Sequence, residues 1–164
     1  MTKNASEAVS DLDREAAPKI EAELRGLLAD ALTLYIKTKS FHWHMRGRHF
    51  CDYHLLLDEH AGQIFGITDD LAERTRKLGG TNLRSIEDIS RQRRLNDWDR
   101  VDLCAEEMLR ELQSDNRQFT RLLRIAHAGC ERRNDVASTS LIEVRTDQSE
   151  RRTWFLAEIV TETP

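Results

Sequence analysis

Apolar residues recur at steps of three and four along most of the chain, a spacing that places them on one face of a helix. The first such series begins at Leu24 and ends at Thr38. Pro18 suits the first turn of this helix, where its missing N–H group costs nothing. The pattern predicts a helix over residues 18–44.

A second apolar series begins at Phe50 and restarts the helical pattern after a short break. Gly47 lies in that break and can take the left-handed conformation that ends a helix. Gly79 and Gly80 follow the series and stop it. The pattern predicts a second helix over residues 50–77, antiparallel to the first.

The next part of the chain predicts a long polar connection and a third helix. Residues 81–96 are polar, and the segment SIEDISR within them favours a short helix of its own. Asp97 is a plausible cap for a long helix that carries Trp98 and Val101. Gly129 is expected just past the end of that helix.

A last helix is expected after Asn134, which can cap it, and its apolar positions extend from Val136 to Ile159. Its middle, RTDQSERR, is very polar, so this helix has the weakest pattern. Four long helices with a long second connection predict an all-α, ferritin-like four-helix bundle with a short helix in the crossover. We assign residues 17–164 to this domain and residues 1–16 to a mobile N-terminal tail.

The composition narrows the classes of partner and compartment. The 164 residues suit one domain, and 2 Pro and 7 Gly leave long stretches that favour helix. The net charge is −4, with acids spread along the chain, so no basic stripe for nucleic acid is evident. No apolar run approaches a membrane span or a signal peptide. Cys51, Cys104 and Cys130 have no CxxC spacing, which fits free thiols, and we expect a cytoplasmic protein.

Histidines and carboxylates gather on the first two helices. His42 ends the first helix and His54 lies one turn into the second, so an antiparallel pair brings the rings near one another. His54 and Asp58 are four residues apart, as are Asp69 and Glu73, so each pair shares a helical face. The two pairs are separated by about three turns, or about 16 Å, so one chain cannot bring them to one metal ion.

The two pairs nevertheless share one midpoint, which lies between Gln63 and Ile64. A two-fold axis at that point would set the first pair of one chain opposite the second pair of another, giving two equivalent sites per dimer. Gly62 and Gly66 beside the crossing would allow close approach. Imidazole and carboxylate donors of this kind suit ferrous iron, with manganese and zinc as competitors.

Each of these residues also has an ordinary structural explanation when it is taken alone. His42 follows an apolar stripe and could be a hydrogen-bonded core histidine. Asp69 beside Asp70, and Glu73 beside Arg74, could form a solvated face with ion pairs. The shared midpoint is what favours a metal site for the set.

The stretch FHWHMRGRHFCDYHLLLDEH, followed by TDDLAERTRKLGG, resembles the Dps family, the DNA-binding proteins from starved cells or mini-ferritins. The resemblance covers residues 41–80 without a gap and is weaker in DVASTSLIEV and RRTWFLAE. It implies a hollow dodecamer that oxidises ferrous iron, preferably with hydrogen peroxide, and stores ferric mineral, with no organic cofactor. It also implies that the ferroxidase centre lies between two-fold related subunits and is formed by His42, His54, Asp58, Asp69 and Glu73.

The resemblance adds roles for individual residues. The three carboxylates are expected to be iron ligands, and the two histidines to be ligands or to orient peroxide. Trp43 is expected to be oxidised, so that hydroxyl radical is not released. It could instead be a packing aromatic at an interface. No histidine has a glutamate three residues before it, so the Glu-x-x-His motif of a centre inside one bundle is absent.

Two family traits are less well supported. Acids outnumber bases in residues 1–19 and in residues 158–164, so we expect no appreciable DNA binding through the tails. Ser140 stands where relatives often carry Asp at an iron entry pore. The remaining candidate pore acids, or simply a solvated helix face, are Asp135, Glu143 and Asp147. The alternative functions are a nucleoid-packing protein and a structural cage without ferroxidase activity.

Overall fold

The first two helices have the bounds that their apolar pattern predicts. In the computed structural model, α1 spans Ala17–His44, with Pro18 in its first turn, and α2 spans Phe50–Lys77. Gly47 has a φ of 114° and Gly79 a φ of 89°, so both chain reversals use a conformation that other residues rarely adopt. The structure describes residues 11–13, 15–100 and 102–161.

Two expectations concern residues outside this described part. The mobile tail proposed for residues 1–16 falls mostly there, because residues 1–10 and 14 are not described. Within the described part of that segment, Leu12 packs against the hydrophobic core. Val101, expected in the third long helix, also lies outside the described residues.

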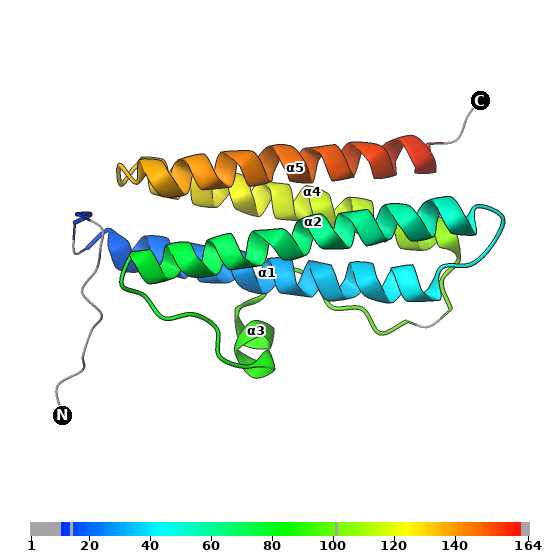
Figure 1. Cartoon of the computed structure of the whole chain (residues 1–164), viewed down its shortest axis with the longest axis horizontal. Helices are drawn as coiled ribbons and strands as arrows, with labels where there is room; N and C mark the ends of the chain where they lie inside the picture. Colours follow the sequence, from blue (N-terminus) through cyan, green and yellow to red (C-terminus); the bar gives the residue numbers. More distant parts are fainter. Residues whose placement is uncertain (1–10, 14, 101, 162–164) are drawn as a thin grey trace.

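The crossover contains the predicted short helix, α3, which spans Ile86–Gln92. Ser85 caps it, because its hydroxyl oxygen accepts a hydrogen bond from the N–H of Asp88 at 3.1 Å. Helix α3 lies outside the bundle and packs beside α1 (Figure 1). The crossover is therefore a structured segment held against the bundle.

The third long helix begins later than its apolar pattern predicts. Helix α4 spans Ala105–Glu131, so the assignment of Asp97 as its cap and of Trp98 to its first turn is wrong. Glu107 marks the true start, since its carboxylate accepts a hydrogen bond from the N–H of Cys104 at 2.8 Å. Trp98 instead belongs to the crossover.

The ends around the last helix are also corrected. Gly129 lies inside α4 and not past its end. Helix α5 spans Val136–Val160, and its cap is Asp135, whose carboxylate accepts from the N–H of Ser138 at 3.0 Å. Asn134, the predicted cap, has a φ of 56° and forms the reversal before it.

The four long helices lie side by side in an elongated bundle (Figure 1). Helices α1 and α2 form one antiparallel pair, and α4 and α5 form the other. Because α2 and α4 run in the same direction, the crossover must return along the length of the bundle (Figure 1). The described residues contain no strand, which confirms the all-α prediction.

The crossover is anchored to the bundle by Asp30 of α1, which is fully buried. Its carboxylate accepts hydrogen bonds from the N–H groups of Arg94 at 2.5 Å and Leu95 at 3.1 Å. The Arg94 guanidinium also donates to this carboxylate, with Nε 2.9 Å from Asp30 Oδ2. A buried carboxylate thus compensates two N–H groups that regular structure does not satisfy.

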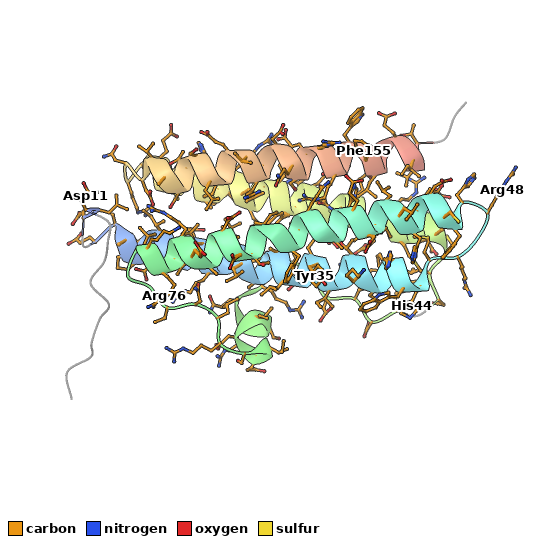
Figure 2. The ribbon with its side chains drawn as sticks, viewed as in Figure 1. Asp11, Tyr35, His44, Arg48, Arg76 and Phe155 are labelled. Atoms are coloured by element: carbon orange, nitrogen blue, oxygen red, sulfur yellow. The ribbon has the colours of Figure 1, made fainter. Side chains whose placement is uncertain are left out.

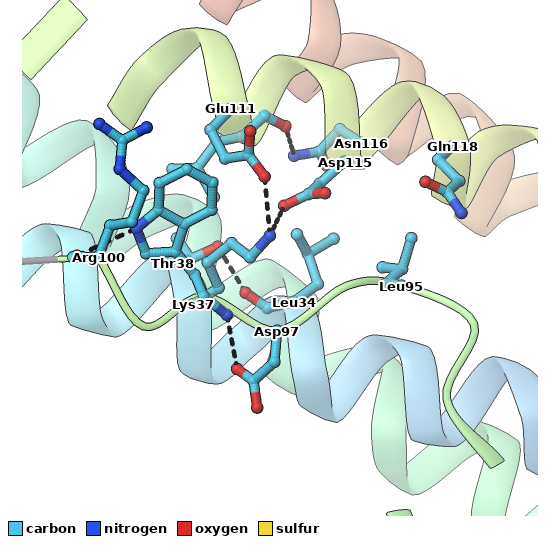
Figure 3. Close-up of polar contacts among 12 residues, drawn as sticks. Leu34, Lys37, Thr38, Leu95, Asp97, Arg100, Glu111, Asp115, Asn116 and Gln118 are labelled. Carbon is cyan, nitrogen blue, oxygen red and sulfur yellow. Dashed lines mark hydrogen bonds and ion pairs between the residues drawn. The ribbon is translucent and has the colours of Figure 1, made fainter. Parts of the chain in front are cut away.

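A second buried polar contact joins α1 to α4 (Figure 3). The Lys37 ammonium is 3.1 Å from Glu111 Oε1 and 2.6 Å from Asp115 Oδ2, and Lys37 is 3% exposed. Trp98 of the crossover covers it, with the ring centroid 5.6 Å from Nζ. Burial raises the pKa of Asp115, and the hydrogen bond from Lys37 opposes that rise.

The polar middle of α5 is a continuous helix, and inward side chains from it form hydrogen bonds to α4. Arg152 is fully buried and donates from Nε to Asn116 Oδ1 at 2.9 Å. Ser149 accepts from the Thr120 hydroxyl at 2.9 Å. No helix in the described part of the chain has the length and apolar character of a membrane span.

Candidate metal centre on α1 and α2

The rings of His42 and His54 lie against one another, as the antiparallel arrangement of α1 and α2 predicts. Their centroids are 3.7 Å apart and their planes differ by 22°. His42 is 8% exposed, so the pair sits at the edge of the core near the link between the two helices. The label of His44 marks this end of α1 (Figure 2).

The backbone fixes the orientation of both rings. His42 Nδ1 is 2.8 Å from the carbonyl oxygen of His54, and His54 Nδ1 is 3.1 Å from the carbonyl oxygen of His42. A carbonyl oxygen can only accept, so each Nδ1 carries the proton and donates it. In the neutral imidazole this leaves the lone pair on Nε2, which is the form in which imidazole binds a metal.

Asp58 brings a carboxylate to the same place. Its Oδ1 is 3.9 Å from His42 Nε2, although the Asp58 side chain is 60% exposed. One turn of α2 separates Asp58 from His54, and this spacing puts both on the face that meets His42. Three of the predicted site residues therefore gather within one protomer.

Lys39 is also part of this cluster, although it is not among the predicted site residues. Its ammonium is 2.8 Å from Asp58 Oδ1 and 5.9 Å from the ring centroid of Trp43. The hydrogen bond and charge of Lys39 lower the pKa of Asp58. The signal in the sequence was its position three residues before His42, which places both on one face of α1.

Asp69 and Glu73 lie apart from this cluster. Both are exposed on α2, and Glu73 pairs with Lys77 at 3.2 Å, one turn further along the helix. Within the described residues of one chain, no three His, Cys, Asp or Glu side chains are placed to hold a metal ion together, and this includes His42, His54 and Asp58. Helix geometry separately keeps Asp69 and Glu73 about three turns from His54 and Asp58.

The face of α2 that carries these carboxylates also has exposed apolar side chains. Leu55 is 67% exposed and Phe65 54% exposed. A Cβ atom added at Gly62 or Gly66 would meet nothing within 4 Å, so no contact inside the protomer requires a glycine there. Helix α2, from residue 50 to residue 77, is itself centred between Gln63 and Ile64.

Trp43 projects from α1 beside the cluster and is 64% exposed. Its ring is held only by the Lys39 ammonium among the contacts of the described residues. An aromatic side chain this exposed is available both to a redox reaction and to a neighbouring subunit. The structure of one protomer leaves both roles for Trp43 open.

The proposed pore acids have different positions. Asp135 is 2% exposed, caps α5 and pairs with Arg74 at 2.6 Å, so it is a structural residue and not a pore-lining acid. Glu143 is 2.9 Å from His127 Nε2. Asp147 is exposed on α5, as expected for an ordinary solvated helix face.

Comparison with known proteins agrees with the fold. A model of the ferritin-like domain matches residues 21–164. The DNA protection during starvation protein 1 of Deinococcus radiodurans is 28% identical over 149 residues, which are 91% of this chain and 72% of that protein. The DNA protection during starvation protein of Agrobacterium fabrum is 26% identical over 153 residues, 93% of this chain and 94% of that one.

Solved structures show the same similarity. DpsC from Streptomyces coelicolor superimposes with a TM-score of 0.88 at 28% identity, covering 94% of this chain and 90% of that chain. An archaeal Dps homologue from Halobacterium salinarum superimposes with a TM-score of 0.91 at 23% identity, covering 98% and 88%. The second likeness concerns the fold alone.

Proposed function

The chain belongs to the ferritin-like family, as a mini-ferritin of the Dps type, and from this premise we propose that it oxidises ferrous iron and stores the ferric product as mineral. Iron is the substrate of this reaction. Consumption of ferrous iron together with peroxide would protect the cell from oxidative damage, because those two species otherwise generate hydroxyl radical.

The observation that carries the proposal is the orientation of the two imidazoles beside Asp58. Both Nδ1 atoms donate to backbone carbonyls, so in the neutral rings the lone pairs are on Nε2, and one Nε2 lies 3.9 Å from Asp58 Oδ1. Imidazole and carboxylate are donors that suit ferrous iron. Manganese and zinc would compete for these donors.

A second copy of the chain would complete the site. Asp69 and Glu73 are exposed on the same helix, about three turns from His54 and Asp58. An antiparallel crossing of two α2 helices between Gln63 and Ile64 would bring the second pair of one chain to the first pair of the other. The exposed apolar side chains and the two open glycines of α2 support this crossing.

The reaction would be a redox reaction assisted by fixed charges. Two ferrous ions each give up one electron, and hydrogen peroxide takes two electrons and two protons to become two water molecules; oxygen is the alternative oxidant. Carboxylates favour the ferric product, since its extra positive charge interacts more strongly with them. Trp43, exposed beside the site, would supply an electron when a single-electron oxidant escapes the iron.

The assembly that follows from the family is a closed dodecamer built from such dimers. We place it in the cytoplasm, which fits the free state of Cys51, Cys104 and Cys130. We propose no organic cofactor, because iron and its ligands suffice for the reaction.

DNA binding is not part of this proposal, although the matched relatives are named for DNA protection. Helices α4 and α5 form a groove with Arg117, Arg121 and Arg124, but Arg124 is paired with Glu150. The positive charge of the groove is therefore partly neutralised, and the chain carries a net charge of −4, so attraction to the DNA backbone should be weak. We expect no gel shift at that salt concentration, and a clear shift would contradict this expectation.

Stopped-flow oxidation tests the proposal. The protein is loaded anaerobically with ferrous ion and mixed with peroxide, and ferric absorbance is followed. We expect rapid growth in the wild type and in a Glu87→Ala/Asp99→Ala control, whose two acids are exposed on the crossover. The His54→Ala/Asp58→Ala variant should lose the fast phase. Equal rates in all three proteins would defeat the site assignment.

A further inference from the structure

The short link between α1 and α2 is rich in basic side chains. Arg46, Arg48 and His49 occur within four residues and are all exposed. The two guanidinium groups form no ion pair or hydrogen bond with any side chain or backbone group of the described residues. Elsewhere in the chain, Arg74 and Arg94 have acidic partners in Asp135 and Asp30.

These bases stand at the rim of a pocket of about 310 Å³. The pocket lies at the end of the bundle where Arg48 projects outward (Figure 2). Its floor is apolar and includes Leu109 of α4 and Val160 of α5, which are 1% and 7% exposed. Its volume falls at the lower end of the range of about 300 to 1,000 Å³ that is usual for small-molecule sites.

The charge of the pocket is positive. Glu106 is its one acid among the described lining residues, and Arg110 already neutralises it through Nη2, 2.6 Å from Oε1. Arg46 and Arg48 are therefore in excess. Ala105 and Glu106 also line the pocket, and their N–H groups belong to the first turn of α4, where no intrahelical acceptor is available.

We propose that this pocket binds a small phosphate-class oxyanion through Arg46 and Arg48, with His49 and the first N–H groups of α4 as further donors. Guanidinium groups match phosphate oxygens with paired, charge-assisted hydrogen bonds. The N–H groups at a helix start are further donors that favour an anion nearby. Either free phosphate or the phosphate end of an organic molecule has this chemistry.

The apolar and aromatic walls of the pocket should distinguish an organic phosphate from free phosphate. Tyr53 lines the pocket and stacks obliquely with His49, with ring centroids 5.7 Å apart. An organic phosphate could place its apolar part against these rings and the floor, whereas inorganic phosphate uses the rim alone. The proposal is independent of iron oxidation, because none of these residues belongs to the His42, His54 and Asp58 cluster.

Equilibrium dialysis of the metal-free assembled protein tests the site, with inorganic phosphate and adenosine monophosphate as probes at 0.15 M NaCl. We expect saturable binding with a Kd of about 1 mM or lower for at least one probe. Arg46→Gln/Arg48→Gln should weaken it about tenfold or more, since two charge-assisted contacts are lost. Tighter binding of adenosine monophosphate would identify an organic ligand, and equal binding would identify free phosphate.

The matched control is Arg84→Gln/Arg132→Gln, which removes the same charge from two exposed arginines outside the pocket. It should bind both probes within twofold of the wild type at this salt concentration, where exposed charges more than about 8 Å apart are screened. No saturable binding of either probe, or an equal loss in the control, would overturn the proposal. Gel filtration of each variant verifies that the assembly is unchanged.

Discussion

At the scale of single residues, the candidate centre depends on which atoms are left free. The backbone carbonyls of His42 and His54 hold the opposite rings by Nδ1 and so expose both Nε2 atoms. The Lys39 ammonium lies 2.8 Å from Asp58 Oδ1. A ferrous ion bound by Asp58 would therefore compete with this ammonium group for the carboxylate.

This competition makes a prediction for Lys39→Met. Removing a positive charge beside Asp58 should tighten ferrous binding about threefold or more, because the ion no longer meets a like charge. Anaerobic calorimetry of the wild type and the variant measures the affinity. Lys19→Met, an exposed lysine at the start of α1, should bind as the wild type does. Weaker binding by Lys39→Met would mean that Lys39 positions Asp58 for the metal.

At the scale of elements, apolar periodicity predicted the bounds of α1 and α2 because their buried faces are regular and their ends carry Pro18, Gly47 and Gly79. It failed at the start of α4. Trp98 continues the apolar pattern, but it packs on Phe41, with ring centroids 6.0 Å apart, from the crossover. Tertiary packing of this kind leaves no local signal.

The site was predictable to a similar extent. Spacing alone brought His54 and Asp58 to one face and kept Asp69 and Glu73 away from them. The role of Lys39 was not predicted, because a lysine on a helix face is usually solvated. Arg46 and Arg48 were likewise unremarkable until the pocket between the ends of three helices gave them a common rim.

The buried contact between α1 and α4 makes a prediction at this scale. Lys37→Met would leave Glu111 and Asp115 without their cation, and should cost about 3 to 5 kcal/mol of unfolding free energy at pH 7. Urea denaturation measures the loss. Replacing all three residues, as Lys37→Met/Glu111→Leu/Asp115→Leu, should recover much of it. A loss below about 1 kcal/mol in the single variant would contradict this view of the contact.

The same variant should show a characteristic pH dependence. Burial already raises the pKa of Asp115, and removing Lys37 takes away the group that opposes the rise. A carboxyl whose pKa is higher in the folded than in the unfolded state stabilises the folded state at low pH. This stabilisation is lost as pH rises through the folded pKa. The deficit of Lys37→Met relative to the wild type should therefore shrink as pH falls from 7 toward 5.

At the scale of the whole molecule, one protomer presents part of the proposed centre and an uncovered helix face. Leu55 and Phe65 are more than half exposed. They lie on the same face as Gly62 and Gly66, where no contact inside the chain requires a glycine. A second α2 helix crossing there would cover the face and complete the centre at once. Assembly and chemistry would then depend on the same surface.

Gly62→Ala/Gly66→Ala separates assembly from folding. Within one protomer the two methyl groups meet nothing, and each replacement should favour helix by about 0.5 to 1 kcal/mol. Between two closely crossing helices they should clash, so we expect helical protein with impaired dimer formation in analytical ultracentrifugation. Unchanged assembly would show that the helices do not approach closely at these glycines.

Complementation between two inactive chains tests the shared centre most directly. His54→Ala/Asp58→Ala and Asp69→Ala/Glu73→Ala are each expected to lack rapid peroxide-driven iron oxidation. Co-expressed, they would form mixed dimers with one intact centre, and random pairing would restore about a quarter of the wild-type centres. A fast phase of about that amplitude is the predicted result. A mixed assembly as inactive as its two parents would contradict a centre divided between two chains.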